Sequence, residues 1–211
     1  SPLLREAGDL SSALTDAEGE LIAQGRDIPI HMGVMAATVK EFLKLVPAGR
    51  LAPGDVWFLN LPEIGGNHLP DVKAIRPIHV DGGLRAFAVS LAHWADIGGA
   101  LPGSYVPNAT DAWQEGLRIP PFRLFTADGP QREKLDMILA NLRGPEEREG
   151  DILAQVAATR TAEQRFQELV GRQGAETVQA AIAALHDQSE AQMRAAIGAL
   201  PDGTYEGTDW L

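Results

Sequence analysis

Residues 72–92 read VKAIRPIHVDGGLRAFAVSLA, a pattern that predicts two strands joined by a tight turn. The segments 72–80 and 84–92 are rich in aliphatic and β-branched residues, and Asp81-Gly82-Gly83 between them is a strong turn signal. Pro77 cannot donate a hydrogen bond to a neighbouring strand, so we expect the first strand to be an edge strand or to carry a bulge. This hairpin is the element from which the rest of the fold is predicted.

The register of the hairpin predicts which residues meet at its open end. A three-residue loop places Val80 opposite Leu84, and the same count places Asp71 opposite His93; a two-residue loop shifts the pairing by one position. Directly opposed residues of an antiparallel pair have Cβ atoms about 4.5–5.5 Å apart. We therefore expect Asp71 and His93 to lie close together, with His68 entering from the loop just before the first strand.

That loop belongs to the segment GGNHLPDV at residues 65–72. Two imidazoles and a carboxylate form a set of ligands suited to Zn, Mn or Fe(II), with positions left open for water or substrate. A histidine next to a carboxylate also occurs without a metal, where the carboxylate only selects the imidazole tautomer. Both interpretations of His68, Asp71 and His93 remain open on these patterns alone.

Two further residues are candidates for catalysis. Asp96, in LAHWADIGG, could be another ligand or a hydrogen-bond partner of an imidazole, and it could equally cap a turn. His31, in DIPIHMGVM, could carry a proton, although a histidine packed near a helix start is somewhat favoured. His79 and His186 are interpreted as structural or solvated residues.

Composition excludes several classes of function. The chain has 211 residues, a formal net charge of −11 and no basic run, so a nucleic-acid partner is not expected. It has no cysteine, which leaves nitrogen and oxygen ligands for any metal and excludes a thiol nucleophile. The sequence has no apolar run of membrane-spanning length and no signal-peptide pattern, which together predict a cytoplasmic protein without a membrane partner.

The chain divides into two regions of different composition. Residues 1–125 are rich in glycine and proline and predict a sheet-rich region, with a hairpin over 10–24, a helix over 35–46 and a strand over 56–60. Residues 126–211 predict a helical region. Pro145 suits the first turn of a long helix that ends near Gly174, a second long helix runs to about Leu200, and residues 204–211 could return as a strand.

These segments predict an α+β fold. A mixed sheet with glycine-rich loops carries the site, and an antiparallel pair of long helices follows it, with both regions in one compact domain. The sequence contains no P-loop, no dinucleotide-binding fingerprint and no nucleophile elbow. If the reaction uses ATP, this chain does not show where the nucleotide binds.

Six motifs in series resemble the hydantoinase B/oxoprolinase family. They occur in the family's order and span nearly the whole chain: SPLLREAGDLSSALTDAEGELIAQ, IPIHMGVM, LAPGDVWFLNLPEIGGNHLPDV, AHWADIGG, AWQEGLRIPP and NLRGPEEREGDILAQ. Family chains usually run more than twice this length, so the sequence resembles the N-terminal half of a longer family chain.

The resemblance implies a function and a set of ligands. Family members form one half of cytoplasmic, ATP-dependent machines that open cyclic amides such as 5-oxoproline or N-methylhydantoin, and a hydantoinase A-type subunit or domain binds the ATP and Mg. The B-type part carries a divalent metal, Zn, Mn or Fe, near positions that match His68, Asp71 and His93. Asp9, in the opening Asp-x-Ser-x-Ala-Leu motif, is implied as a further ligand.

The resulting expectation is a metal-binding catalytic subunit or domain of an ATP-dependent cyclic amidohydrolase, acting on a hydantoin, 5-oxoproline or lactam ring. One alternative is a subunit of an ATP-dependent ketone carboxylase of the acetone or acetophenone type, and another is a non-catalytic assembly subunit. Two departures from the family pattern bear on the substrate. Leu61 stands where an aspartate is frequent, and Trp94 stands where a second histidine is common.

Overall fold

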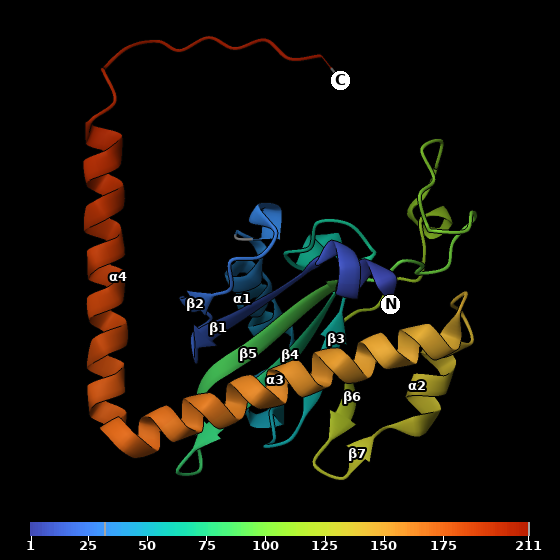
Figure 1. Ribbon diagram of the computed structural model, residues 1–211, viewed down its shortest axis with the longest axis horizontal. Coiled ribbons are helices and arrows are strands. Elements are labelled where there is room, and N and C mark those ends of the chain that lie inside the picture. The colour runs from blue at the N-terminus through green and yellow to red at the C-terminus, as the bar shows by residue number, and fades with distance from the viewer. Residues whose placement is uncertain (32, 211) are drawn as a thin grey trace.

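The structure is a computed structural model that describes residues 1–31 and 33–210 (Figure 1). Strands dominate the first two thirds of the chain and long helices the last third. The elements in order are η1 (Leu3–Ala7), β1 (Leu10–Asp16), β2 (Leu21–Gln24), η2 (Pro29–His31), α1 (Val34–Leu45), η3 (Ala48–Arg50), β3 (Val56–Leu59), η4 (Pro62–Ile64), β4 (Asp71–Val80), β5 (Gly83–His93), η5 (Ala112–Gln114), β6 (Phe122–Thr126), β7 (Gly129–Pro130), α2 (Arg132–Leu139), α3 (Pro145–Gln173) and α4 (Ala175–Gly198).

The strands form one sheet whose described members lie in the order β2-β1-β5-β4-β3-β6-β7. Every strand pairing among the described residues is antiparallel, so the α+β class is confirmed while the sheet is not mixed. The predicted hairpins over 10–24 and 72–92 are both present. The sheet also joins them, because β1 pairs with β5.

The central hairpin has a shorter turn than the three-residue loop considered from sequence. Val80 pairs with Gly83, so the loop consists of Asp81 and Gly82, whose φ angles of 51° and 77° suit a type I′ turn. Arg85 is an extra residue on β5, because the pairing shifts between Ile78 and His79. This irregularity restores the register that places Asp71 opposite His93, as predicted.

Pro77 lies in an interior strand rather than an edge strand. β4 is flanked by β5 and β3, but the pairing with β3 extends only from Lys73 to Ile75, two residues before Pro77. At Pro77 the strand is therefore paired with Phe87 of β5 alone. Because the β3 pairing does not reach Pro77, the missing N–H of the proline costs no hydrogen bond to β3. The predicted bulge lies next to it, between Ile78 and His79.

Helices cover both faces of the sheet (Figure 1). On one face, α1 buries Met35, Val39 and Phe42 against Phe87 and Leu91 of β5. On the other face, α2 and α3 pack against alternate residues of the same strands, and a second core forms there around Phe58, Val72, Trp94, Leu135 and Ile152. The two-residue alternation along β4 and β5 therefore divides their side chains between the two cores.

The two long helices form as predicted but do not lie antiparallel. Figure 1 shows α4 leaving the end of α3 at a steep angle. Gly174, with φ 83° and ψ 147°, is the single residue between them. A helical hairpin needs a loop of about two to five residues, so one residue cannot reverse the chain direction. The packed apolar residues of α4 are Val178 and Ile182 near its base, and His186 farther along contacts Leu21 of β2.

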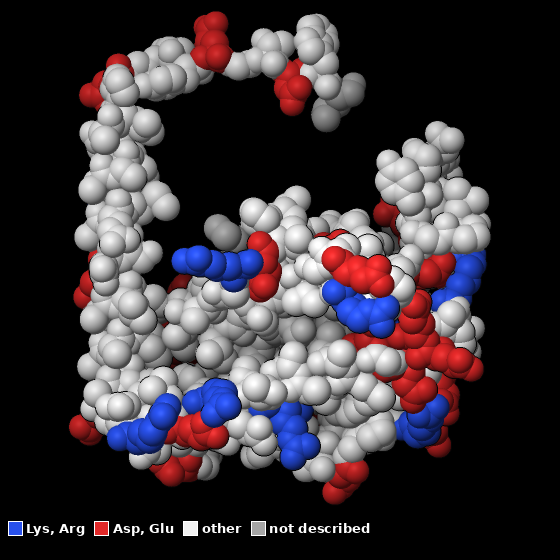
Figure 2. All heavy atoms as spheres, in the orientation of Figure 1, with Lys and Arg blue, Asp and Glu red and all other residues white. Residues whose placement is uncertain are grey.

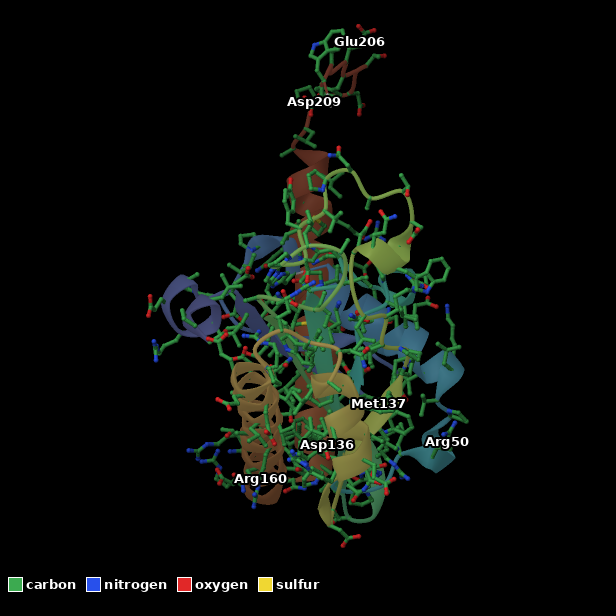
Figure 3. All side chains as sticks on the ribbon, turned by 90° about the vertical axis from the view of Figure 1, so that its right-hand side faces the viewer. Arg50, Asp136, Met137, Arg160, Glu206 and Asp209 are labelled. Atoms are coloured by element: carbon green, nitrogen blue, oxygen red, sulfur yellow. The ribbon has the colours of Figure 1, made fainter. Side chains whose placement is uncertain are left out.

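Beyond that base, α4 is exposed and continues into an extended tail. Figure 2 shows Lys, Arg, Asp and Glu gathered along α3, whereas α4 presents mainly uncharged side chains on this face. Residues 201–210 form no strand, contrary to the prediction for 204–211, of which Leu211 lies outside the described residues. Figure 3 shows Glu206 and Asp209 of the tail far from the sheet. Among the described residues, no helix combines the length and apolarity that crossing a membrane requires.

Candidate metal centre

Three neighbouring strands bring ionisable side chains into one row. Asp71 begins β4 and pairs with His93, which ends β5. On the other side of β5, the backbone N–H of His93 donates to the carbonyl of Asp9, just before β1, at 3.1 Å. Asp71 and His93 are each two residues from Lys73 and Leu91 along their strands, so they point toward the face covered by α1.

His68 completes a compact group at this edge of the sheet. Its Nε2 lies 3.0 Å from Oδ1 of Asp71 and 3.1 Å from Nδ1 of His93, while Nδ1 of His93 lies 3.2 Å from the same Oδ1. The structure therefore brings the three predicted residues together, with one potential ligand atom of each within 4.8 Å of the others. The side chain of Asp71 is buried, and that of His68 is 52% exposed.

The electrostatics of the group favour a charged Asp71. Burial alone would raise the pKa of this carboxyl, but hydrogen bonds with His68 and His93 outweigh it, and the pKa falls far below its ordinary value. The hydrogen bond with Asp71 also raises the pKa of His68, against the opposing effect of burial. The buried carboxylate is thus an anion at neutral pH.

Asp9 and His31 both lie next to this group. Oδ2 of Asp9 is 3.8 Å from Nδ1 of His93, next to the three converging ligand atoms but not one of that group. His31 is buried at the end of η2, where its Nδ1 lies 2.9 Å from the hydroxyl of Ser11 and its Nε2 lies 3.6 Å from Oδ2 of Asp71. The imidazole of His31 therefore contacts Asp71 on the side away from His68.

Asp96 is not brought to the group. Its Oδ1 accepts a hydrogen bond from Gly98 N and its Oδ2 one from Gly103 N, each at 2.8 Å, and Arg143 lies 3.2 Å from Oδ2. These contacts close the loop after β5, which is the turn-capping role considered from sequence. Both carboxylate oxygens are occupied there, so the structure offers no contact between Asp96 and the histidines.

The other histidines and Trp94 also lie outside the group. Nε2 of His186, on α4, is 2.9 Å from the carbonyl of Leu21. Trp94 is fully buried and donates from Nε1 to Gln155 of α3, so it belongs to the core on the opposite face of the sheet. Trp94, which stands where the family often has a second histidine, therefore contributes to packing rather than to the site.

Sequence reasoning missed several polar residues that support the group. Asn67 Nδ2 donates to Oδ2 of Asp71 at 3.1 Å. Asn60, fully buried, donates to the carbonyls of Leu69 and Leu117 and so anchors the loop that carries His68. Lys73 is buried beside Asp71, and burial lowers its pKa to about 8. The role of Asn67 could have been found from sequence, because it directly precedes His68. The role of Asn60 could not, because its contacts are with Leu69 and Leu117, 9 and 57 residues away.

The residues present fit a divalent cation. Ligands bound at about 2.0–2.1 Å in tetrahedral or octahedral geometry are roughly 2.9–3.4 Å from one another. The three distances among His68, Asp71 and His93 lie in this range. Asp71 and Asp9 together would supply two negative charges beside two imidazoles, which matches a doubly charged ion without thiolate ligands.

The family model described as hydantoinase B/oxoprolinase matches residues 1–211. The chain belongs to this family. The beta subunit of the caprolactamase from Pseudomonas jessenii is 38% identical over 209 residues, which cover 99% of this chain and 36% of that protein. The B-type subunit of a putative D-/L-hydantoinase from Pseudomonas sp. (strain NS671) is 34% identical, over 100% of this chain and 36% of that protein.

Two solved structures agree with the fold of this hydantoinase B/oxoprolinase family member. The crystal structure of the ATP-dependent caprolactamase from Pseudomonas jessenii superposes with a TM-score of 0.92 at 37% identity, over 96% of this chain and 35% of that one. A nucleotide-free acetone carboxylase structure gives a TM-score of 0.78 at 24% identity, over 83% of this chain and 23% of that one, and shares the fold. The chain spans about a third of the length of the curated relatives described above.

Proposed function

We propose that this chain is the metal-binding catalytic part of an ATP-dependent enzyme that opens a cyclic amide, such as a lactam, a hydantoin or 5-oxoproline. Support comes from the family and from the relatives, which include a caprolactamase and the 5-oxoprolinase of Saccharomyces cerevisiae, the latter 44% identical over 55% of this chain and 9% of that protein. The single observation that carries the proposal is the convergence of His68, Asp71 and His93 on one point at the solvent-facing edge of the sheet.

His68, Asp71 and His93 would hold the cation, and Asp9 would supply the fourth ligand. A bound divalent metal would supply Lewis acidity, either to an amide carbonyl or to a water molecule whose pKa it lowers. The half-exposed His68 marks the side from which a substrate could approach, while buried Asp71 fixes the opposite side. An amide is a poor electrophile, so activation by ATP followed by hydrolysis at such a centre is chemically consistent.

ATP and Mg would bind to a companion subunit or domain of the hydantoinase A type. The described residues carry no P-loop, and two relatives are named as subunits, which supports an assembly with a partner. A cytoplasmic location, shared with that partner, remains a prediction of the family resemblance.

Elemental analysis tests the metal site directly. We expect stoichiometric Zn, Mn or Fe in the protein purified without chelator, and loss of most of this metal in His68→Ala and His93→Ala. His186→Ala is the matched control, because it removes an imidazole that contacts Leu21 rather than the group. Circular dichroism must show that all variants are folded. Absence of metal from the unmodified protein would favour the non-catalytic assembly role.

Turnover assays test the reaction. With the companion subunit and ATP present, we expect release of the ring-opened product, which is an amino acid from caprolactam or 5-oxoproline and an N-carbamoyl amino acid from a hydantoin. We expect this product to be lost in His93→Ala. The ketone carboxylase alternative predicts instead that turnover of a ketone requires bicarbonate. ATP hydrolysis that depends on bicarbonate and a ketone, with every cyclic amide inert, would overturn the amidohydrolase proposal.

A further inference from the structure

We propose that Ser11 and His31 act as a positioning pair that orients the carboxylate of Asp71, so that its Oδ1 is held toward His68 and His93. This inference rests on the proposed metal-binding function and assigns a role to two residues beyond the ligands themselves. It starts from the way in which the two oxygens of Asp71 divide their contacts.

The two carboxylate oxygens of Asp71 face different groups. Oδ1 faces the candidate ligands, at 3.0 Å from His68 and 3.2 Å from His93. Oδ2 faces away from them, accepts a hydrogen bond from Asn67 at 3.1 Å and lies 3.6 Å from Nε2 of His31. A carboxylate held at one oxygen presents the other in a defined direction, which is how residues behind a metal ligand tune its affinity.

Ser11 determines which nitrogen of His31 carries the proton. Its hydroxyl lies 2.9 Å from Nδ1 of His31, while Nε2 of the same ring faces the anionic Oδ2 of Asp71. A hydroxyl can donate or accept, but a carboxylate can only accept. The arrangement in which every contact is favourable therefore has Ser11 donating to Nδ1 and Nε2–H pointing at Asp71. Removing the hydroxyl removes the reason for this tautomer.

Burial makes the arrangement rigid. Ser11 is 0% exposed and His31 is 2% exposed, so neither can exchange its partner for bulk water. Ser11 lies on β1 opposite Leu91 of β5, two residues from Asp9 and on the same face of the sheet. The strand that supplies the fourth candidate ligand thus also supplies the hydroxyl behind Asp71.

A matched pair of substitutions separates the hydroxyl from the shape of the side chain. Ser11→Thr keeps the hydroxyl, and Ser11→Val has the same branched shape without it. Using Co²⁺ as the probe, we expect Ser11→Val to weaken binding by about 10- to 100-fold relative to Ser11→Thr. The visible absorption bands of bound Co²⁺, which report the geometry of its ligands, should shift in Ser11→Val alone. Equal affinities and identical spectra for the two variants would overturn the inference.

A second pair covers the case in which position 11 tolerates neither residue. His31→Leu removes both ring nitrogens, whereas His31→Gln keeps an amide that can donate toward Asp71, so Gln should retain more Co²⁺ affinity than Leu. Nitrogen NMR of His31 in the metal-free protein adds a readout that needs no cation: protonated Nε2 is expected in the unmodified chain and in Ser11→Thr, with a changed tautomer ratio in Ser11→Val.

These readouts distinguish failure of this inference from failure of the proposed function. If the unmodified protein binds no Co²⁺, the metal-binding function is overturned, and the inference about Asp71 falls with it. If the protein binds Co²⁺ but the NMR spectrum of His31 shows protonated Nδ1, the positioning pair is overturned while the metal site stands.

Discussion

The side chain of Asp71 is contacted from β5, from the loop that carries His68 and from the segment before α1. Its side chain contacts His68, His93, Asn67 and His31, which lie on three separate stretches of the chain. Since the carboxylate is buried, removing it would leave imidazoles facing one another without an anion. The geometry of the site is therefore sensitive to small backbone changes around this residue.

Gly65 tests that sensitivity. It has φ +69°, and a Cβ there would lie 2.7 Å from the backbone N of Thr38 in α1, so we expect Gly65→Ala to lower the free energy of unfolding by about 2–4 kcal/mol through strain and overlap. Gly144 has the same φ and, among the described residues, open space around it, so Gly144→Ala should cost only about 1–2 kcal/mol. Urea titration of both variants measures the difference; equal losses would contradict the close contact with α1.

Asp96 predicts a pH dependence of stability. Burial opposes its ionisation, but hydrogen bonds from Gly103, Gly98 and Arg143 prevail and hold its pKa below the ordinary 3.8. A carboxyl whose pKa is lowered on folding contributes stability above its unfolded pKa and loses that contribution as the pH falls through the folded value. We expect Asp96→Asn to be less stable by about 1–3 kcal/mol at pH 7.

This penalty should begin to shrink as the pH falls below about 4, where the carboxyl of the unfolded chain takes up a proton, and it should disappear as the pH passes through the lower pKa of the folded carboxyl. Denaturant unfolding of both proteins between pH 7 and pH 3 measures it. A penalty that stays constant over that range would show that the charge of Asp96 is not what holds the loop.

Among the elements, the β4–β5 hairpin shows how a turn and a bulge together set a register. The two-residue turn alone would have moved Asp71 one position away from His93, and the extra residue Arg85 restores the pairing. A shift of one residue would also reverse the faces of one strand relative to the other. The bulge is therefore needed both for the core and for the site.

Helix α4 is anchored at its base, which predicts unequal effects of one substitution at two places. Ile182 is 5% exposed and packs with Phe166 and Val178, whereas Ile197 is 59% exposed. Ile182→Ala should lower the free energy of unfolding by about 2–5 kcal/mol, and Ile197→Ala should change it by no more than about 0.5 kcal/mol. Comparable losses in urea titrations would mean that the outer half of α4 is packed in solution.

For the whole molecule, the candidate centre links β1, β4, β5 and the loop before β4, so its occupancy should be coupled to global stability. A ligand that binds only the folded state at one hundred times its Kd adds about 2.7 kcal/mol to the free energy of unfolding. We expect saturating Mn²⁺ or Zn²⁺ to raise the melting temperature, and a chelator to reverse the change. His68→Ala should melt at the same temperature with and without the ion; an equal rise in that variant would place the binding elsewhere.

Much of this architecture could be predicted from local patterns. Alternation and the Asp81-Gly82 turn signal lie within one contiguous segment, so the hairpin follows from short-range physics. The Asp71–His93 pairing was predicted with a three-residue loop, and the shorter turn together with the extra residue Arg85 gives the same register. Pro145 and Gly174 delimit α3 for the same reason, because the conformational limits of proline and glycine act locally. The three candidate ligands were therefore accessible before any coordinates.

Other features depend on contacts that no local pattern encodes. The pairing of β1 with β5, which brings Asp9 and Ser11 to the site, depends on how whole faces of the sheet pack. The same packing buries His31 against Asp71 and retains Asp96 in a loop. The direction of α4 depends on one backbone conformation at Gly174. Sequence alone determined the two hairpins, the strand at 56–59, the long helices and the core of the candidate ligand set, but not β6, β7 or the course of the tail. Tertiary structure decided which elements are neighbours, because burial is shared by residues far apart in the chain.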